Sequence, residues 1–211
     1  MTFAKESLPF VLPLAVAALV LFLLRQTTWA VAFGGIAVLV LLFFRLPSRQ
    51  SNAGDDSILA PANGRILRID RSPSLIDSGE DVQRIVTFLS VFNVHVQRAP
   101  VGGEVVESRF TPGRKIAAFK PQAGTVNENH LTIFRRSDGE LFGVRQIAGL
   151  VARRVVCRLV PGDLVERGDL MGLIKFGSRV DLMLSDNHEI LVRPGDRLRE
   201  GETVVARPKK P

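Results

Sequence analysis

The chain has 211 residues, of which 46% are hydrophobic, and a formal net charge of +7 from 28 basic and 21 acidic side chains. Its single cysteine, Cys157, excludes an internal disulfide and a multi-cysteine metal site, and the three histidines have no zinc-binding spacing, so we expect no metal. The sequence also has no helix-turn-helix pattern and no aromatic residues interleaved with basic ones, so its positive charge favours a membrane surface over nucleic acid as partner.

Two apolar runs, residues 8–24 and 29–44, begin the chain and are separated by only four residues. Each is close to the short end of the roughly 17 to 25 residues that span a bilayer as a helix. We therefore expect residues 1–45 to form a membrane-anchoring helical hairpin. A cleaved signal peptide is the alternative for the first run, but the second run follows at once and argues for retention.

Basic residues flank the predicted hairpin on both sides, with Lys5 before it and Arg45 and Arg49 after it. By the positive-inside rule both ends of the hairpin would be cytoplasmic. This predicts a protein of the cell (inner) membrane whose remaining residues lie on the cytoplasmic face. A shallow re-entrant hairpin in one leaflet stays open as an alternative.

Residues 46–57 are polar and predict a linker, and from residue 58 the pattern changes to short β-rich runs bounded by Gly, Pro, Asp and Asn. We predict one mostly β domain over residues 58–211, built as a flattened β-barrel or sandwich. Residues 149–154 are the best candidate for a short helix. The predicted strands are residues 64–69, 84–90, 95–98, 104–107, 131–135, 143–147, 155–160, 170–174, 180–184 and 203–206.

An internal repeat supports this architecture. Two Pro-Gly-Asp turns begin at Pro161 and Pro194, and each is followed by a valine or leucine and then by a second glycine, Gly168 or Gly201. The repeat resembles the hammerhead elements of the β-sandwich in biotinyl and lipoyl carriers, which recur in flattened barrels.

The chemistry that these residues could perform is concentrated at Gly177-Ser178 and at His95. A serine directly after a glycine can attack its own backbone, because Gly177 has no side chain to hinder the approach and tolerates strained backbone angles. The alternative is a tight turn between two strands. His95 has a side chain that titrates near neutrality and is the best general acid or base in the sequence, although a hydrogen-bonded strand histidine is the alternative.

Four segments in order along the chain resemble phosphatidylserine decarboxylase, in the short, membrane-hairpin (archaeal-type) form of the proenzyme. They are Ala60-Pro61-Ala62-Asn63-Gly64-Arg65, residues 90–100 around His95, residues 146–154, and residues 172–181 with Phe176-Gly177-Ser178. The resemblance implies that Ser178 attacks the Gly177 carbonyl, that the chain is cleaved into residues 1–177 and 178–211, and that Ser178 becomes a pyruvoyl group.

The resemblance also implies the reaction of the mature enzyme. The pyruvoyl ketone would take the place of pyridoxal phosphate, form a Schiff base with the amine of phosphatidylserine, and accept the electrons released with CO2, which yields phosphatidylethanolamine. His95 matches the family histidine assigned to acid–base work. The family often pairs, so a homodimer is an expectation, whereas the lipid tails and an archaetidylserine headgroup stay open.

Asn63 and Arg98 differ from residues that other members of the family carry at these positions. Asn63 stands where family members usually carry an aspartate, and an amide cannot stabilise an imidazolium as a carboxylate does, so maturation could be slow. Arg98 stands where the long forms carry a second histidine, and it could bind the substrate phosphate or carboxylate or pair with an acidic neighbour. His130 and His188 are read as a strand-capping residue and a solvated turn.

A function from a different class is an uncleaved, membrane-tethered homologue that acts as a binding or adaptor module. A lipoylated carrier would need an exposed lysine at a hairpin tip, where this chain has Gly177-Ser178. Whether the chain is cleaved between residues 177 and 178 therefore distinguishes the enzyme hypothesis from the adaptor hypothesis.

Overall fold

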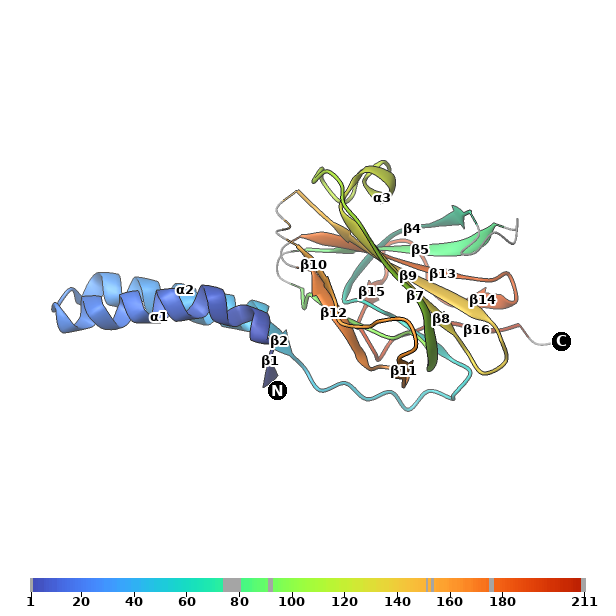
Figure 1. Cartoon of the computed structure of the whole chain (residues 1–211), viewed down its shortest axis with the longest axis horizontal. Coiled ribbons are helices and arrows are strands. Elements are labelled where there is room, and N and C mark those ends of the chain that lie inside the picture. The colour runs from blue at the N-terminus through green and yellow to red at the C-terminus, as the bar shows by residue number, and fades with distance from the viewer. Residues whose placement is uncertain are drawn as a thin grey trace. The chain divides into compact units, whose positions relative to one another are not determined.

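The computed structural model describes residues 2–73, 81–90, 93–150, 152, 154–174 and 177–209. The chain divides into two units, Met1–Ser48 and Arg49–Pro211. Figure 1 shows the first unit as a pair of helices and the second as a β-rich body with one short helix.

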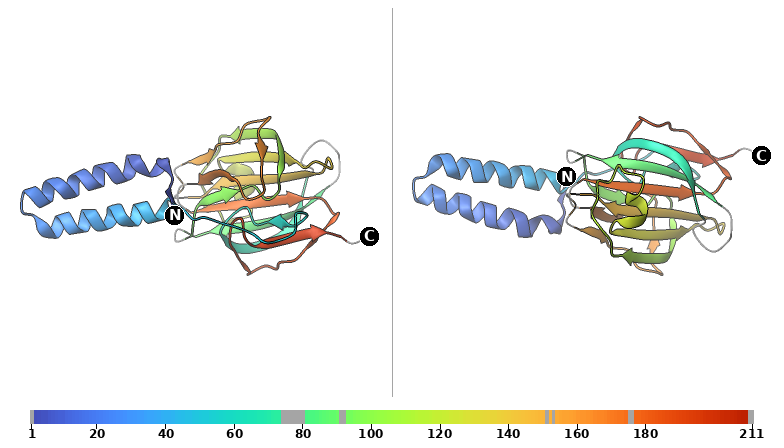
Figure 2. Two further views of the ribbon diagram at one scale, coloured as in Figure 1. Left: turned by 90° about the horizontal axis from the view of Figure 1, so that it is seen from below. Right: turned by 90° about the horizontal axis from the view of Figure 1, so that it is seen from above.

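The first unit is an apolar helical hairpin, as the sequence predicts. A short 3-10 helix (η1, Lys5–Ser7) leads into α1 (Leu8–Leu23), and α2 (Thr27–Phe43) returns beside it (Figure 2). Two short strands, β1 (Thr2–Phe3) and β2 (Arg45–Leu46), pair at the open end of the hairpin. The stretch Lys5–Leu23 is long and apolar enough to cross a membrane, and α2 is a shorter apolar helix.

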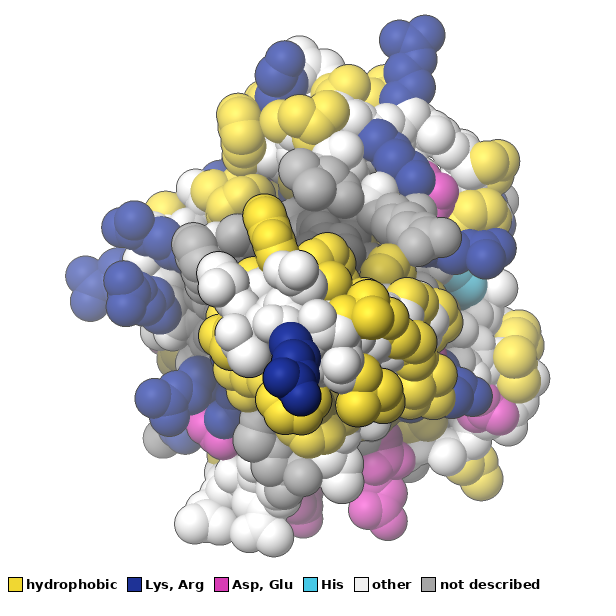
Figure 3. Space-filling model, turned by 90° about the vertical axis from the view of Figure 1, so that its left-hand side faces the viewer, with side chains coloured by type: hydrophobic (Ala, Val, Ile, Leu, Met, Phe, Trp, Pro, Cys, Tyr) yellow, Lys and Arg dark blue, Asp and Glu magenta, His cyan; other side chains and the backbone are white. Residues whose placement is uncertain are grey.

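Apolar side chains cover the hairpin on all sides rather than along one stripe. Leu23, Val31 and Leu39 are each about 70% exposed or more, and the space-filling view shows hydrophobic side chains over the hairpin (Figure 3). A helix that is hydrophobic around its whole circumference needs an apolar environment. The hairpin therefore has the surface of a membrane anchor.

The second unit is mostly β, which confirms the predicted fold class. Its main sheet is antiparallel and has eight strands in the order β11-β7-β8-β9-β13-β5-β4-β15, and two three-stranded sheets have the orders β10-β12-β6 and β14-β16-β3. The elements are β3 (Ile58–Leu59), β4 (Gly64–Ser72), β5 (Val82–Leu89), β6 (Val96–Arg98), β7 (Gly103–Thr111), α3 (Ala123–Val126), β8 (Asn129–Arg135), β9 (Leu141–Ala148), β10 (Val155–Cys157), β11 (Leu164–Val165), β12 (Leu170–Ile174), β13 (Ser178–Leu184), β14 (His188–Ile190), β15 (Arg197–Leu198) and β16 (Val204–Pro208).

Strand β13 lies in the middle of the main sheet, paired with β5 on one side and β9 on the other. All of its residues are buried. Because successive side chains of a strand point to opposite faces, Val180, Leu182 and Leu184 join the main hydrophobic core, whereas Met183 joins a smaller cluster on the other face. Ser178 has the same parity as Val180 and therefore points toward the main core.

The Pro-Gly-Asp repeat is present with matching hydrogen bonds in its two copies. Gly162 and Gly195 have φ angles of 95° and 97°, and each donates its backbone N–H at 2.8 Å to a carbonyl, that of Val105 or of Ile66. The turns lead into β11 and β15, which form the two opposite edges of the main sheet. The two copies therefore occupy equivalent places.

The equivalence extends to the strands that pair with these turns. The Gly168 N–H binds the Ala99 carbonyl and the Gly201 N–H binds the Ala60 carbonyl, both at 2.9 Å. The segment Ala60-Pro61-Ala62-Asn63-Gly64-Arg65 is thereby equivalent to Ala99-Pro100-Val101-Gly102-Gly103-Glu104. This second half of the repeat was not among the sequence predictions.

Each strand predicted from the sequence is present, but the predicted helix over residues 149–154 is wrong for the residues that the structure describes there. Gly149, Leu150, Ala152 and Arg154 are not helical, and the Ala152 N–H closes a turn onto the Gly149 carbonyl at 3.0 Å. Residues 151 and 153 lie outside the described part of the chain. The short helix of this unit is α3 instead.

Candidate active site

Ser178 is the first residue of β13, where its side chain is fully buried. Its cross-strand partners are Leu89 on β5 and Ala148 on β9. The Ser178 hydroxyl makes no hydrogen bond to any described residue. A buried hydroxyl without a partner costs free energy, so it is a feature that calls for a chemical reason.

Gly177 precedes Ser178 with a φ angle of 55°, in the left-handed region that glycine adopts readily. Its carbonyl lies directly against the Cα of Gly149: a Cβ on Gly149 would stand 3.0 Å from the Gly177 carbonyl carbon and closer still to its oxygen. Because Gly149 has no side chain, the Gly177 carbonyl can occupy this space. Phe176, the first residue of the predicted tripeptide, lies outside the described residues.

His95 is buried and contacts Gly177, and its two ring nitrogens have distinct partners. Nδ1 donates to the carbonyl of Asn93 at 2.8 Å, and Nε2 accepts the backbone N–H of Gly177 at 3.2 Å. These roles require the proton on Nδ1 and a lone pair on Nε2. The structure thus brings His95, Gly177 and Ser178 together from segments that are about eighty residues apart in sequence.

A chain of buried amides supports the strand that carries His95. The Gln97 side chain donates to the His95 carbonyl at 2.9 Å, and the Gln146 side chain donates to the Gln97 side chain at 2.7 Å. Both glutamines are fully buried. The sequence analysis did not identify them, because each stands next to an arginine, Arg98 or Arg145, and its burial is not apparent from the sequence.

Asn127 is a second residue that sequence reasoning missed. Its buried side chain amide donates to the carbonyls of Ile116 and Ala148, at 2.8 and 2.6 Å, and accepts the Ile116 N–H at 3.0 Å. Ala148 is the cross-strand partner of Ser178, so Asn127 ties the segment around Ile116 to the sheet beside Ser178.

Asn63 lies near the site but does not hydrogen-bond to it. It lines a cavity together with Ser90 and Asn93, and the structure gives its side chain no hydrogen bond to His95 or Ser178. The group that orients His95 among the described residues is the carbonyl of Asn93. An aspartate-like role for Asn63 stays a prediction.

Arg98 lies on β6 in a different polar cluster. Its guanidinium donates to the Gly168 carbonyl at 2.7 Å, and burial lowers its pKa, opposed by the charge of nearby Glu200. Glu200 is itself fully buried and paired with Arg49 at 3.0 Å. Both predicted roles of Arg98, substrate binding and pairing with an acidic neighbour, stay predictions.

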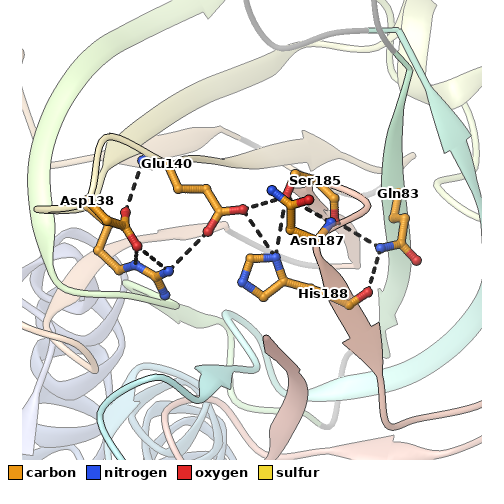
Figure 4. A network of polar contacts seen from close by, with 7 residues as sticks. Gln83, Asp138, Glu140, Ser185, Asn187 and His188 are labelled. Atoms are coloured by element: carbon orange, nitrogen blue, oxygen red, sulfur yellow. Dashed lines mark hydrogen bonds and ion pairs between the residues drawn. The ribbon is translucent and has the colours of Figure 1, made fainter. Parts of the chain in front are cut away.

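The other two histidines belong to separate networks. His130 lies within β8, and its Nε2 is 2.8 Å from the hydroxyl of Ser108, so it is a strand residue rather than a cap. His188 is buried, which corrects its reading as a solvated turn: Nδ1 lies 3.3 Å from the Glu140 carboxylate. Figure 4 shows that carboxylate pointing at both His188 and Ser185.

Among the described residues, no three His, Cys, Asp or Glu side chains converge in a way that could hold a metal ion. The reactive groups that do converge are a hydroxyl, an imidazole and a glycine carbonyl. That set is suited to nucleophilic attack on the carbonyl with proton transfer to the imidazole.

The chain is similar to known proteins over nearly its whole length. The family model described as phosphatidylserine decarboxylase matches residues 36–206. The chain is 40% identical over 204 residues to a phosphatidylserine decarboxylase proenzyme of Syntrophotalea carbinolica, which covers 96% of this chain and 94% of that protein. It is 44% identical over 207 residues to a protein of Methanothermobacter thermautotrophicus named provisionally as an archaetidylserine decarboxylase proenzyme, which covers 88% of this chain and 92% of that protein.

Proposed function

This chain belongs to the phosphatidylserine decarboxylase family, and we propose that it converts phosphatidylserine to phosphatidylethanolamine and CO2 with a pyruvoyl group made from its own Ser178. Membership of the family makes it a decarboxylase proenzyme of phospholipid biosynthesis. The observation that carries the proposal is the buried hydroxyl of Ser178, which lies directly after the Gly177 carbonyl and has no hydrogen-bond partner among the described residues.

Self-cleavage begins with an acyl shift within the chain. The Ser178 oxygen bonds to the Gly177 carbonyl carbon, the peptide C–N bond breaks, and the Ser178 nitrogen becomes an amine. Loss of the Ser178 Cα proton then breaks the Cβ–O bond, which leaves a carboxylate on Gly177 and dehydroalanine at residue 178. Tautomerisation and addition of water release ammonia and leave the pyruvoyl group as the new amino terminus.

His95 is the base that we assign to the hydroxyl proton in this sequence. Its Nε2 carries a lone pair and lies 3.2 Å from the Gly177 nitrogen, one peptide unit from the bond that breaks. The hydrogen bond from Nδ1 to the Asn93 carbonyl holds the ring in the tautomer that can accept a proton at Nε2. The left-handed Gly177 and the absence of a side chain on Gly149 support the close approach of hydroxyl and carbonyl.

The buried start of β13 would hold the pyruvoyl group between Leu89 and Ala148. There it would supply the electron sink that pyridoxal phosphate supplies in other decarboxylases. His95 then delivers a proton to the carbon that loses the carboxylate, and the buried setting limits the access of water.

The two products of cleavage, residues 1–177 and 178–211, stay associated in this proposal. β13 keeps its ladder with β5 and with β9 on its two sides, so the small chain remains within the sheet. The apolar hairpin anchors the large chain in the cell (inner) membrane, where we expect the β-rich unit on the cytoplasmic face beside its lipid substrate.

The test is the purified full chain, analysed on a denaturing gel and by intact mass. We expect fragments of residues 1–177 and 178–211, the smaller one blocked to amino-terminal sequencing. Ser178→Ala should give one full-length species without decarboxylase activity, and His95→Ala should strongly slow both steps. Ser137→Ala, at an exposed turn, is the matched control and should cleave normally. A single uncleaved species from the wild-type chain would instead support the adaptor alternative.

A further inference from the structure

Exposed apolar side chains stand on two loops that meet at Gly177. Leu150 is 67% exposed and directly follows Gly149, the residue whose Cα lies against the Gly177 carbonyl. Phe119 is 58% exposed and directly follows Ala118, whose Cβ would lie 3.2 Å from a Cβ on Gly149. Both side chains are therefore exposed at the end of the main sheet where β13 begins.

Val126 is a third exposed apolar side chain at this end of the sheet. It directly precedes Asn127, whose side chain binds the Ala148 carbonyl at 2.6 Å, and its own carbonyl accepts the Arg114 N–H at 2.7 Å. Single exposed apolar residues are ordinary on a protein surface. Three of them in the loops around one buried reactive group indicate an interaction surface.

The same loops are basic. Residues 111–127 and 148–155 contain no Asp or Glu and five basic residues, Arg114, Lys115, Lys120, Arg153 and Arg154. Lys115 lies 3.9 Å from the Glu128 carboxylate. Arg114, Lys120 and Arg154 are exposed, and none of them forms an ion pair with an acidic residue in the part of the chain that the structure describes. This end of the sheet therefore carries positive charge that the protein does not neutralise.

The charges at the opposite end of the main sheet are paired with each other. Asp138, in the turn after β8, accepts a hydrogen bond from Arg136 at 2.8 Å. Asp186, in the turn after β13, accepts one from Arg71 at 2.9 Å. The unpaired positive charge and the exposed apolar loops thus coincide at the end that holds Ser178.

An anionic bilayer is the partner that this combination of side chains fits. Apolar side chains among basic ones are typical of protein surfaces that enter the interface of a membrane, where the basic residues bind anionic lipids. The proposed substrate is itself an anionic lipid, and its headgroup has to reach a Ser178 side chain that is fully buried. Loops that enter the headgroup layer would bring the site to the lipid.

We propose that these loops form a membrane-docking surface, made of the apolar residues Phe119, Val126 and Leu150 and the basic residues Arg114, Lys120 and Arg154. The apolar side chains insert among the lipid headgroups, and the basic ones bind lipid phosphates. The inference rests on the proposed function for the lipid nature of the substrate. The apolar hairpin tethers the chain to the bilayer, whereas the docking surface turns the Ser178 end of the β-rich unit toward it.

The first test measures whether single labels enter the bilayer, on the full chain with Ser178→Ala to prevent cleavage and Cys157→Ser to leave one cysteine. A fluorescent NBD label on Leu150→Cys or Phe119→Cys should be quenched by lipids that carry a nitroxide at position 5 of an acyl chain, in phosphatidylglycerol vesicles. Ser137→Cys, at an exposed turn of the opposite end, is tethered by the same hairpin and should not be quenched. Equal quenching at all three positions, or none at residues 119 and 150, would overturn the proposal.

The second test concerns the charges and the competing occupant, with the label on Leu150→Cys. Lys120→Gln together with Arg154→Gln should raise the fraction of phosphatidylglycerol needed for half-maximal quenching at least about twofold. Lys209→Gln, beside Asn187 at the opposite end, is the matched control and should leave it unchanged. An unchanged fraction in the double variant contradicts the proposal. A label that is shielded from aqueous iodide but not quenched by lipid would assign the surface to another protein chain, and the proposal would be wrong.

The third test compares turnover of phosphatidylserine in vesicles with turnover of monomeric dihexanoyl-phosphatidylserine, by the self-cleaving chain. The ratio of the two kcat/KM values should fall about tenfold in Leu150→Ser and in Phe119→Ser. It should not change in Leu164→Ser, an exposed leucine of β11 at the opposite end. An equal fall in Leu164→Ser, or a fall in neither docking variant, refutes the docking surface. Quenched labels in a chain found neither to cleave nor to decarboxylate would refute the proposed reaction while leaving the docking surface in place.

Discussion

Replacement of Gly149 by alanine tests whether the position of the Gly177 carbonyl controls self-cleavage. A Cβ at residue 149 would lie 3.0 Å from the Gly177 carbonyl carbon and inside the contact distance of its oxygen, and 3.2 Å from the Ala118 Cβ. Both neighbours are closer than an ordinary contact, so the new methyl group has no free space. We therefore expect the Gly177 carbonyl to move.

The expected loss of cleavage rate follows from the size of that movement. To reach an ordinary contact distance, the carbonyl oxygen has to move by about 1 Å, and a misplacement of that size in a reacting pair can cost about a hundredfold in rate. β13 cannot move with it easily, because it is paired on both sides. We expect cleavage of Gly149→Ala to slow about a hundredfold, with a loss of stability of about 1 to 3 kcal/mol from overpacking.

The assay is a time course of the uncleaved fraction after synthesis of the full chain, followed on a denaturing gel, with the melting temperature measured on the same material. Gly54→Ala is the matched control, since a Cβ there has no atom within 4 Å, and it should cleave at the wild-type rate. A Gly149→Ala chain that folds and still cleaves at the wild-type rate would refute the reasoning.

Three further predictions concern stability, measured on the uncleaved Ser178→Ala chain. Asn127→Ala leaves three backbone groups without their partner, one of them in a fully buried bond, and should cost about 3 kcal/mol in chemical denaturation; a cost below about 1 kcal/mol would contradict its role as a tie between the two segments. Asp181→Asn removes a carboxylate that accepts two hydrogen bonds at 2.7 Å from the fully buried Arg179, and should cost about 3 to 5 kcal/mol by leaving that charge uncompensated. Burial lowers the pKa of His188 below its ordinary 6.5, opposed by the Glu140 carboxylate, so the unfolded chain binds the proton first as pH falls. Stability should therefore decline below about pH 6.5, and His188→Gln should make the decline of the melting temperature with pH shallower; an unchanged slope would argue against it.

Much of the local structure was predictable because it depends on residues that are close in sequence. Uninterrupted apolar runs predicted the hairpin, and short β-rich runs between Gly, Pro and Asp predicted the strands. The predicted helix at residues 149–154 was wrong because the Gly149 carbonyl accepts the Ala152 N–H in a turn beside the carbonyl of Gly177. That contact joins distant parts of the chain, and no local pattern reports it.

The sequence by itself determined the fold class and the apolar hairpin, and it predicted Ser178 and His95 as the reactive pair through resemblance to one family. Only the tertiary structure decided that the Asn93 carbonyl orients His95, that Gly149 makes room for the Gly177 carbonyl, and that Asn127 ties the segment around Ile116 to Ala148. The physical reason is that the position of a residue along a strand sets which face of the sheet its side chain occupies. Its partners across the sheet depend instead on which strands pair, and these strands are far apart in sequence.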